Sequence, residues 1–196
     1  MNETLKFYND NALSYVDETI NANMENLYAL FQKYVASGAR ILDFGCGSGR
    51  DTKYFSEQGY IVDAIDGSAE LCRIAAEYTG LPVRNMLFNE LDADSLYDGI
   101  WACSSILHIP KAELPDIFAR LHKALAVGGY LYTSFKFGDF CGERNGRFFS
   151  DFTLESLEEM IKDVPGFEIV ETAITADVRQ GRENEKWLNI VLRRNG

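Results

Sequence analysis

The stretch ILDFGCGSGRD, residues Ile41–Asp51, holds the residues of this chain best suited to chemistry. Gly45, Gly47 and Gly49 follow a short apolar run, and Asp43 stands two residues before the first of them. Glycines after a strand let a ligand approach the backbone closely, and the N–H groups that open the next helix point at that ligand. The stretch therefore predicts a ligand site at a strand–helix turn; a turn that is merely tight is the alternative.

The spacing of the glycines favours a cationic ligand over a dinucleotide. The dinucleotide fingerprint is G-x-G-x-x-G, whereas this chain has G-x-G-x-G followed by Arg50. A carboxylate at Asp43 would repel a pyrophosphate but attract the ammonium group of a ligand such as S-adenosylmethionine. Asp66 follows Gly49 by seventeen residues and ends the next expected strand. A carboxylate there can accept both ribose hydroxyls, unless it is an ordinary surface acid.

Apolar runs alternate with helical patterns along most of the chain. This alternation predicts parallel βαβ units, an α/β sheet with helices on both faces. Ser68 and Thr153 have the character of N-caps, and Pro115 marks the start of another helix. Helical patterns are expected at residues 5–35, 51–58, 69–78, 115–126 and 153–164. Strands are expected at 40–44, 60–66, 81–88, 97–106 and 130–137, with 167–178 and 186–194 as an antiparallel pair.

Length and composition limit the classes of protein to consider. The 196 residues suit a single domain, and the net charge of −11 repels phosphate backbones, so no nucleic acid partner is expected. The four cysteines are irregularly spaced and there are only two histidines, so a metal site is not expected. The cysteines are expected to be free thiols, as in a reducing cytosol. The chain shows neither a basic, apolar leader nor a run of 18 apolar residues, so a cytoplasmic protein without a membrane partner is expected.

The stretch CSSILHIP, which ends the fourth expected strand, carries candidate catalytic chemistry. Strand ends face the ligand crevice in this architecture, so Cys103 and Ser104 are expected near the ligand. His108 lies just beyond and is the best candidate for a general base or substrate contact. The alternative is a histidine that packs against the N-terminal helix or caps the next helix. His122 stands in mid-helix and is expected to be structural.

Two further segments are able to cover such a site. The N-terminal stretch FYNDNALSY offers a tyrosine for catalysis, Tyr15, and two substrate contacts, Tyr8 and Asn11, if it is not simply a packed helix. The loop GDFCGERNGRFF carries Arg144 and Arg147, which predict an anionic or carboxylate substrate if the loop is not simply solvated.

The stretches DFGCGSGRD, VDAIDGS, DGIWACSSILHIP and ALAVGGYLYTSF together resemble the successive motifs of the class I S-adenosylmethionine-dependent methyltransferases. The resemblance covers residues 40–137 well and the remainder more loosely. It implies a Rossmann-like, seven-stranded, mostly parallel sheet in the order 3-2-1-4-5-7-6, with strand 7 antiparallel. It also implies S-adenosylmethionine as cofactor and S-adenosylhomocysteine as product, with no metal.

The resemblance implies a role for each matching position around the cofactor. Many members place an acid after the third strand to bind adenine, but this chain has MLF there, so apolar packing of the base is expected instead. The implied contacts are Asp43, Gly45, Cys46 and Gly47 at the methionine part, Arg50 at its carboxylate unless it is a surface residue, Asp66 at the ribose, Gly67 and Ser68 beside the adenosine, Leu87 and Phe88 at the adenine, and Cys103 and Ser104 near the cofactor.

The expected activity is in-line methyl transfer to a small-molecule acceptor, where alignment supplies much of the rate. We expect residues 1–38 to form a helical lid, 39–137 the cofactor-binding core, and 138–196 the substrate loop with the last helix and strand pair, in a monomer or homodimer. Alternatives are an NAD(P)-dependent oxidoreductase and a non-catalytic module that binds S-adenosylmethionine. Within the enzyme class, the acceptor could instead be RNA, a protein or a metalloid such as tellurite.

Overall fold

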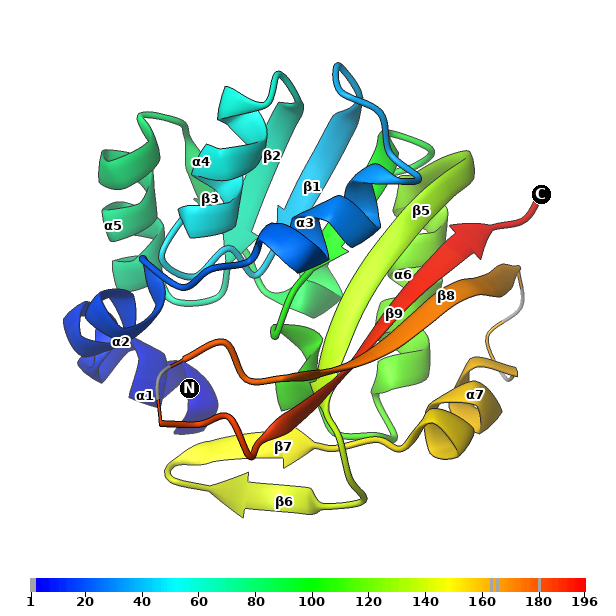
Figure 1. The fold of residues 1–196 in the computed structure, drawn as a ribbon. Helices are drawn as coiled ribbons and strands as arrows, with labels where there is room; N and C mark the ends of the chain where they lie inside the picture. Colours follow the sequence, from blue (N-terminus) through cyan, green and yellow to red (C-terminus); the bar gives the residue numbers. More distant parts are fainter. Residues whose placement is uncertain (1–2, 163, 165, 180) are drawn as a thin grey trace.

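A seven-stranded sheet forms the centre of the molecule (Figure 1). The computed structural model describes residues 3–162, 164, 166–179 and 181–196. The strands lie in the order β3-β2-β1-β4-β5-β9-β8, and only β9 runs antiparallel to its neighbours. When the strands of this sheet are numbered from one to seven along the chain, their order is 3-2-1-4-5-7-6, as expected. The predicted fold class is confirmed. The strands are β1 (Arg40–Phe44), β2 (Ile61–Asp66), β3 (Val83–Asn85), β4 (Tyr97–Ala102), β5 (Leu125–Lys136), β8 (Phe167–Ala176) and β9 (Lys186–Arg194).

Helices cover both faces of this sheet, because parallel strands are apolar on both sides. The side chains of α3 and α4 pack in the core on one face, and those of α6 and α7 pack in the core on the other. Among the described residues no helix is long and apolar enough to cross a bilayer. The helices are α1 (Glu3–Asp10), α2 (Ala12–Thr19), α3 (Glu25–Gln32), α4 (Arg50–Glu57), α5 (Ala69–Thr79), α6 (Leu114–Ala124) and α7 (Leu154–Lys162).

Successive residues of β1 pack alternately into the cores on the two faces of the sheet. Ile41 belongs to the α3–α4 side and Leu42 to the α6–α7 side, and both are fully buried. On the α3–α4 side, the rings of Trp101 and Tyr132 stack with their centroids 4.0 Å apart. Burial of such aromatic pairs contributes on the order of 1 kcal/mol beyond their buried area. This packing holds the carboxyl ends of β1, β4 and β5 in fixed register.

The helical pattern expected at residues 5–35 is divided into three helices. The first break is at Asn11, between α1 and α2. The second precedes α3, where the side chain of Asn23 accepts a hydrogen bond of 2.9 Å from the N–H of Glu25. Asparagine favours such local bonds over a continuous helix, which explains why the periodicity overestimated the length.

The third strand is shorter than expected. It ends at Asn85, and the backbone then turns into the short 3-10 helix η1 (Phe88–Glu90). The carboxylate of Glu90 accepts a bond of 2.7 Å from the N–H of Leu87, which fixes the start of that turn. The apolar residues Leu87 and Phe88 therefore lie outside the sheet, where they line a cavity described below.

The glycine-rich loop expected after β5 is a two-stranded hairpin, β6 (Cys141–Arg144) and β7 (Arg147–Ser150). Asn145 and Gly146 at its tip have φ values of 50° and 75°, the left-handed pair of a type I′ turn. The hairpin lies at the same end of the sheet as α1 and α2 (Figure 1).

Candidate active site

A cavity of about 300 Å³ opens at the carboxyl ends of β1 and β2. Gly45, Gly47 and Gly67 lie in its wall, together with the carboxylate of Asp66. At Gly45, where φ is 90°, an added Cβ would lie 2.5 Å from the Cβ of Ser105. The glycine at this turn is therefore required by both backbone conformation and space.

Asp66 is the best-anchored acid in this cavity. Its two carboxylate oxygens accept hydrogen bonds of 2.9 Å from the N–H of Gly47 and 2.8 Å from the N–H of Ser68. Burial raises the pKa of Asp66, and the backbone N–H bonds of Ser68, Gly47 and Gly67 partly oppose that rise. A carboxylate has about four lone-pair positions, so Asp66 can still accept a hydrogen bond from a hydroxyl group in the cavity.

The far end of this cavity is apolar. Leu87 and Phe88 line it, and the Phe88 ring lies 4.5 Å from that of Phe44. Ile109 and Ile117 complete the apolar surface. The sequence analysis did not identify these two isoleucines, whose positions after β4 and on α6 gave no signal. Leu87 and Phe88, the residues expected at an adenine, thus lie in this apolar wall.

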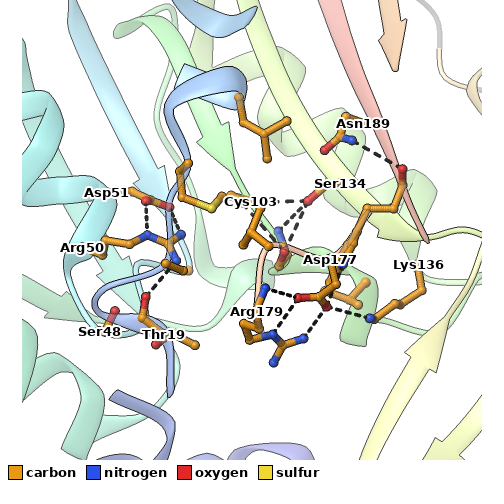
Figure 2. A pocket seen from close by; sticks show the side chains of 18 of the residues that line it. Thr19, Ser48, Arg50, Asp51, Cys103, Ser134, Lys136, Asp177, Arg179 and Asn189 are labelled. Carbon is orange, nitrogen blue, oxygen red and sulfur yellow. Dashed lines mark hydrogen bonds and ion pairs between the residues drawn. The ribbon is translucent and has the colours of Figure 1, made fainter. Parts of the chain in front are cut away.

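A second cavity, of about 120 Å³, adjoins the first (Figure 2). Cys46 and Arg50 line it near the glycine turn, and Cys103 lines it at the end of β4. Five residues line both cavities, so they stand between them: Tyr8, Tyr15, Gly45, Ser104 and His108.

Ser104 occupies a strained position at this boundary. Its φ is 53°, a left-handed value that is rare for a residue other than glycine. Its N–H donates a bond of 2.8 Å to the hydroxyl of Ser134 on β5, which holds the turn in place. Backbone strain of this kind concentrates at functional sites. The predicted location of Ser104 at the site is supported by this geometry.

Arg50 and Asp51 form a buried ion pair beside the second cavity (Figure 2). The guanidinium donates bonds of 2.7 and 2.9 Å to the carboxylate, and a third of 3.1 Å to the carbonyl of Thr19 at the end of α2. Burial opposes ionisation of Asp51, but Arg50 and the hydrogen bonds from Tyr28 and Trp101 outweigh it and lower its pKa. The sequence analysis did not single out Asp51, because an acid after the glycines is also ordinary helix chemistry.

Asp43 does not have the role expected from its position before the glycines. It is buried, lines neither cavity, and accepts a hydrogen bond of 2.5 Å from the hydroxyl of Thr52. Burial and the nearby charge of Asp51 raise the pKa of Asp43 to about 8. Near the glycine turn, Asp51 rather than Asp43 lines the second cavity, so the proposed attraction between Asp43 and a cationic ligand is corrected.

We expect Asp43→Asn to become more stable relative to the wild type as the pH rises. The folded-state pKa of about 8 lies above the ordinary value of 3.8, so the folded wild type loses stability as pH rises between these values. The amide cannot ionise and still accepts the Thr52 bond. Melting temperatures of both proteins from pH 5 to pH 9 measure this, and a constant difference across the range would contradict it.

Ser68 also stands outside both cavities. Its side chain accepts a bond from the N–H of Leu71 and caps α5, as expected, while its hydroxyl donates to the side chain of Asn9 on α1. The prediction that Ser68 flanks a ligand is therefore corrected to a capping role that ties α1 to the core.

His108 is fixed by two partners. Its Nδ1 lies 2.6 Å from the carbonyl oxygen of Phe148, and its Nε2 lies 2.7 Å from the hydroxyl of Tyr8. A carbonyl only accepts, so Nδ1 carries the proton, and Nε2 accepts from Tyr8. Burial, with repulsion from Arg147, lowers the pKa of His108 to about 4 despite the Phe148 bond. The imidazole is therefore a neutral base at pH 7, at the boundary between the cavities.

Tyr15 lies directly over the glycine turn. A Cβ added at Gly47 would be 3.0 Å from its hydroxyl oxygen, and its ring lies 5.1 Å from that of Tyr8. Burial raises the pKa of Tyr15 well above its ordinary value, so the hydroxyl stays protonated. The two tyrosines of the predicted N-terminal segment are thus brought to the site.

The expected substrate residues divide into two groups. Tyr8 and Arg147 line the second cavity. Asn11 is exposed and donates to the carbonyl of Phe7, and Arg144 pairs with Asp151, so neither lines a cavity and both predictions are corrected. Six further polar or aromatic residues of that wall were not expected from the sequence: Lys136, Asp177, Arg179, Arg182, Trp187 and Asn189.

Comparison with known proteins gives the family. Residues 41–129 match the family described as "Methyltransferase domain". A solved structure from Burkholderia thailandensis, 1,6-didemethyltoxoflavin-N1-methyltransferase with bound 1,6-didemethyltoxoflavin and S-adenosylhomocysteine, is 25% identical with a TM-score of 0.78. The comparison covers 98% of this chain and 85% of that one. Residues 41–129 of this chain therefore form a methyltransferase domain, and the S-adenosylhomocysteine-bound neighbour supports the class I S-adenosylmethionine-dependent type.

Curated relatives of this methyltransferase match it over part of their length. A ubiquinone biosynthesis O-methyltransferase from Xylella fastidiosa is 35% identical over 106 residues, 50% of this chain and 42% of the relative. An uncharacterized methyltransferase from Staphylococcus carnosus is 29% identical over 123 residues, 59% of each chain. The methyltransferase thus spans less than two thirds of these relatives. The family match ends at residue 129 and so excludes the hairpin and β8–β9, which line the second cavity.

The cavities of this methyltransferase fit the cofactor of its family. Asp66 suits a ribose, Leu87 and Phe88 suit an adenine, and the spare N–H groups of Arg50 suit a carboxylate. Within the part of the chain that the structure describes, no group of three histidine, cysteine, aspartate or glutamate side chains is placed to bind a metal ion.

Proposed function

We propose that this protein transfers a methyl group from S-adenosylmethionine to a small-molecule acceptor. The observation that carries the proposal is the pair of adjoining cavities, one with Asp66 at a glycine turn and the other beyond Tyr15 and His108. The second cavity, at about 120 Å³, is small and is lined by side chains from both ends of the chain, which favours a small acceptor over a macromolecule.

The chain's own residues bind and orient the two reactants. S-adenosylmethionine, when bound, supplies a methyl group already activated by the sulfonium. Asp66 would hold the ribose, Leu87 and Phe88 the adenine, and Arg50 the carboxylate of the methionine part. Tyr15, over Gly47, would exclude water from the boundary where the cavities meet. Such positioning supplies roughly 7–11 kcal/mol in favourable cases.

His108 would act as the general base when the acceptor nucleophile carries a proton. Its Nδ1 is held by the Phe148 carbonyl, so the proton is accepted at Nε2, where the Tyr8 hydroxyl now donates. The acceptor loses that proton as it gains the methyl group, and Tyr8 either yields its place or passes the proton on.

We propose further that α1 and α2 form the lid over both cavities. Thr4 and Leu5 contribute to the first cavity and Thr19 to the second. Leu5 contacts the backbone at Gly67, where an added Cβ would lie 2.7 Å from its Cδ2. Both ligands would therefore enter before these helices close.

We expect Asp66→Ala to weaken binding of S-adenosylhomocysteine by about 10- to 150-fold, the loss of a hydrogen bond to a charged acceptor. Titration calorimetry measures this, with the melting temperature as a check on folding. The matched control is Asp63→Asn, on the same strand but outside both cavities, which should bind as the wild type does. Tight binding of NAD with none of S-adenosylhomocysteine would overturn the proposed function. Turnover with candidate acceptors separates an enzyme from a binding module.

A further inference from the structure

The two cavities carry opposite charge. The larger one is lined by the carboxylates of Asp66 and Glu113 and, among the described residues, by no lysine or arginine. The smaller one is lined by five cationic side chains and two carboxylates, so cations exceed anions by three: Arg50, Lys136, Arg147, Arg179 and Arg182 against Asp51 and Asp177. In a chain of net charge −11 this local excess of positive charge is a specific feature of the second cavity.

Carboxylates already neutralise most of these cations. Arg50 pairs with Asp51, while Lys136 and Arg179 share Asp177 (Figure 2). Glu185, which lies outside the cavity wall, pairs with Lys136 and with Arg182. Arg147 is the exception, because it has no carboxylate partner among the described residues.

Aromatic rings surround the Arg147 guanidinium without satisfying it. The ring centroids of Phe7, Phe149 and Tyr8 lie 4.5, 5.3 and 5.8 Å from its central carbon. One N–H group lies 3.5 Å from the Tyr8 hydroxyl, and the buried Nε has no hydrogen-bond partner. Ring faces attract a cation but do not accept its in-plane N–H bonds, and a partly buried charge without an acceptor is costly.

The neighbouring arginine of the hairpin has the carboxylate partner that Arg147 lacks, although the buried Nε of each is without a hydrogen-bond partner. Arg144 stands directly opposite Arg147 in the β6–β7 register. It too packs on the ring of Phe149, but it donates bonds of 2.5 and 2.6 Å to the two oxygens of Asp151. The same hairpin therefore pairs one arginine with a carboxylate of the chain and presents the other, without one, to the cavity.

We propose that the methyl acceptor is a small organic acid whose carboxylate binds Arg147 while the atom to be methylated lies beside Tyr8 and His108. The inference rests on the proposed function and specifies its substrate class. One unpaired guanidinium matches one carboxylate, with the planar, paired geometry that such bonds favour. Phe149 and Trp187 line the same cavity and give a flat apolar body a surface to pack against.

The test uses titration calorimetry on the full chain saturated with S-adenosylhomocysteine. The probes are matched acid and amide pairs: 4-hydroxybenzoate, 3,4-dihydroxybenzoate and nicotinate, each with its amide. We expect at least one acid to bind ten or more times more tightly than its amide. Arg147→Gln should remove that preference and leave the affinity for the amide and for S-adenosylhomocysteine unchanged.

Two variants complete the design. Arg147→Lys keeps the charge and should retain part of the acid preference, which distinguishes anion binding from a change in packing. Arg73→Gln removes an exposed arginine of α5 that lies outside both cavities and should behave as the wild type.

The inference is overturned if amides bind as well as acids, if the acid preference survives in Arg147→Gln, or if no acid binds below 10 mM. Binding of S-adenosylhomocysteine, measured first in the same samples, distinguishes a wrong substrate class from a wrong proposed function. When it binds and the acid preference is lacking, only the substrate class is wrong; when it does not bind, the proposed function fails as well.

Discussion

His108→Gln is expected to lower kcat by about 10²- to 10⁴-fold with an acceptor whose nucleophile is protonated, because that is the usual contribution of a general base. The substitution removes the Nε2 that now accepts from Tyr8. Methyl-transfer rates under saturating cofactor measure the loss, and KM should change far less than kcat. His122→Gln is the control, since His122 lies on α6 outside both cavities. Equal kcat values for the wild type and His108→Gln would remove His108 from the mechanism.

The pH dependence of the wild type gives an independent check on the same residue. The folded-state pKa of about 4 lies below the ordinary value of 6.5, so the base is neutral and competent down to about pH 5. In the pH profile of kcat, the decrease on the acidic side that depends on His108 should therefore have its midpoint near pH 4. A His108-dependent midpoint near pH 6.5 would show that burial does not shift its pKa. Protonation of the unfolded chain also makes the folded state lose stability as pH falls from 6.5 towards 4.

Asp51→Ala is expected to lower the free energy of unfolding by about 3–5 kcal/mol, the usual cost of removing one partner of a buried ion pair. Asp51 is 6% exposed and accepts bonds from Arg50, Tyr28 and Trp101, so its loss leaves the Arg50 charge and two polar groups without their acceptor. Urea unfolding followed by circular dichroism measures the change.

Two further variants test the cause of this loss. Glu57→Ala removes an exposed acid from the same helix, α4, and should change stability little. A double substitution, Arg50→Leu with Asp51→Leu, removes both charges and should recover part of the stability, because no unpaired charge stays buried. A loss below 1 kcal/mol in Asp51→Ala would show that water reaches Arg50 and replaces the carboxylate.

The fold was predictable where local patterns agree with the tertiary structure. Alternating apolar strands and helices predicted an α/β sheet with helices on both faces, and the family resemblance implied the strand order. The Ser68 cap was correct because capping depends on neighbours in the sequence. The Asn145-Gly146 pair is a strong hairpin signal that the analysis did not use. Helix breaks at Asn11 and Asn23 depend on side-chain bonds that periodicity does not contain.

The site was predictable at the glycine turn and much less so beyond it. Motif spacing located Gly45, Gly47 and Asp66. Spacing does not say where a side chain points, however, and the Asp43 side chain is buried in the core. Arg144 and Arg147 are both arginines of one short segment, and only the register of the hairpin decides which of them pairs with Asp151.

The residues of β8–β9 illustrate the same limit at long range. Lys136 and Asp177 stand 41 positions apart, yet their side chains lie 3.2 Å apart. No local pattern links them, because they are brought together by β9, which pairs with β5 on one side and with β8 on the other.

The position of β9 has a consequence for biosynthesis. This strand comes after the other strands in the sequence, yet it lies between β5 and β8 and pairs with both. While the ribosome is still making residues 186–194, β8 has no neighbour and one edge of β5 is open, so the nascent chain exposes two unpaired strands until translation passes this segment. Completion of the sheet, and with it the wall formed by Lys136, Asp177 and Trp187, therefore requires residues 186–194.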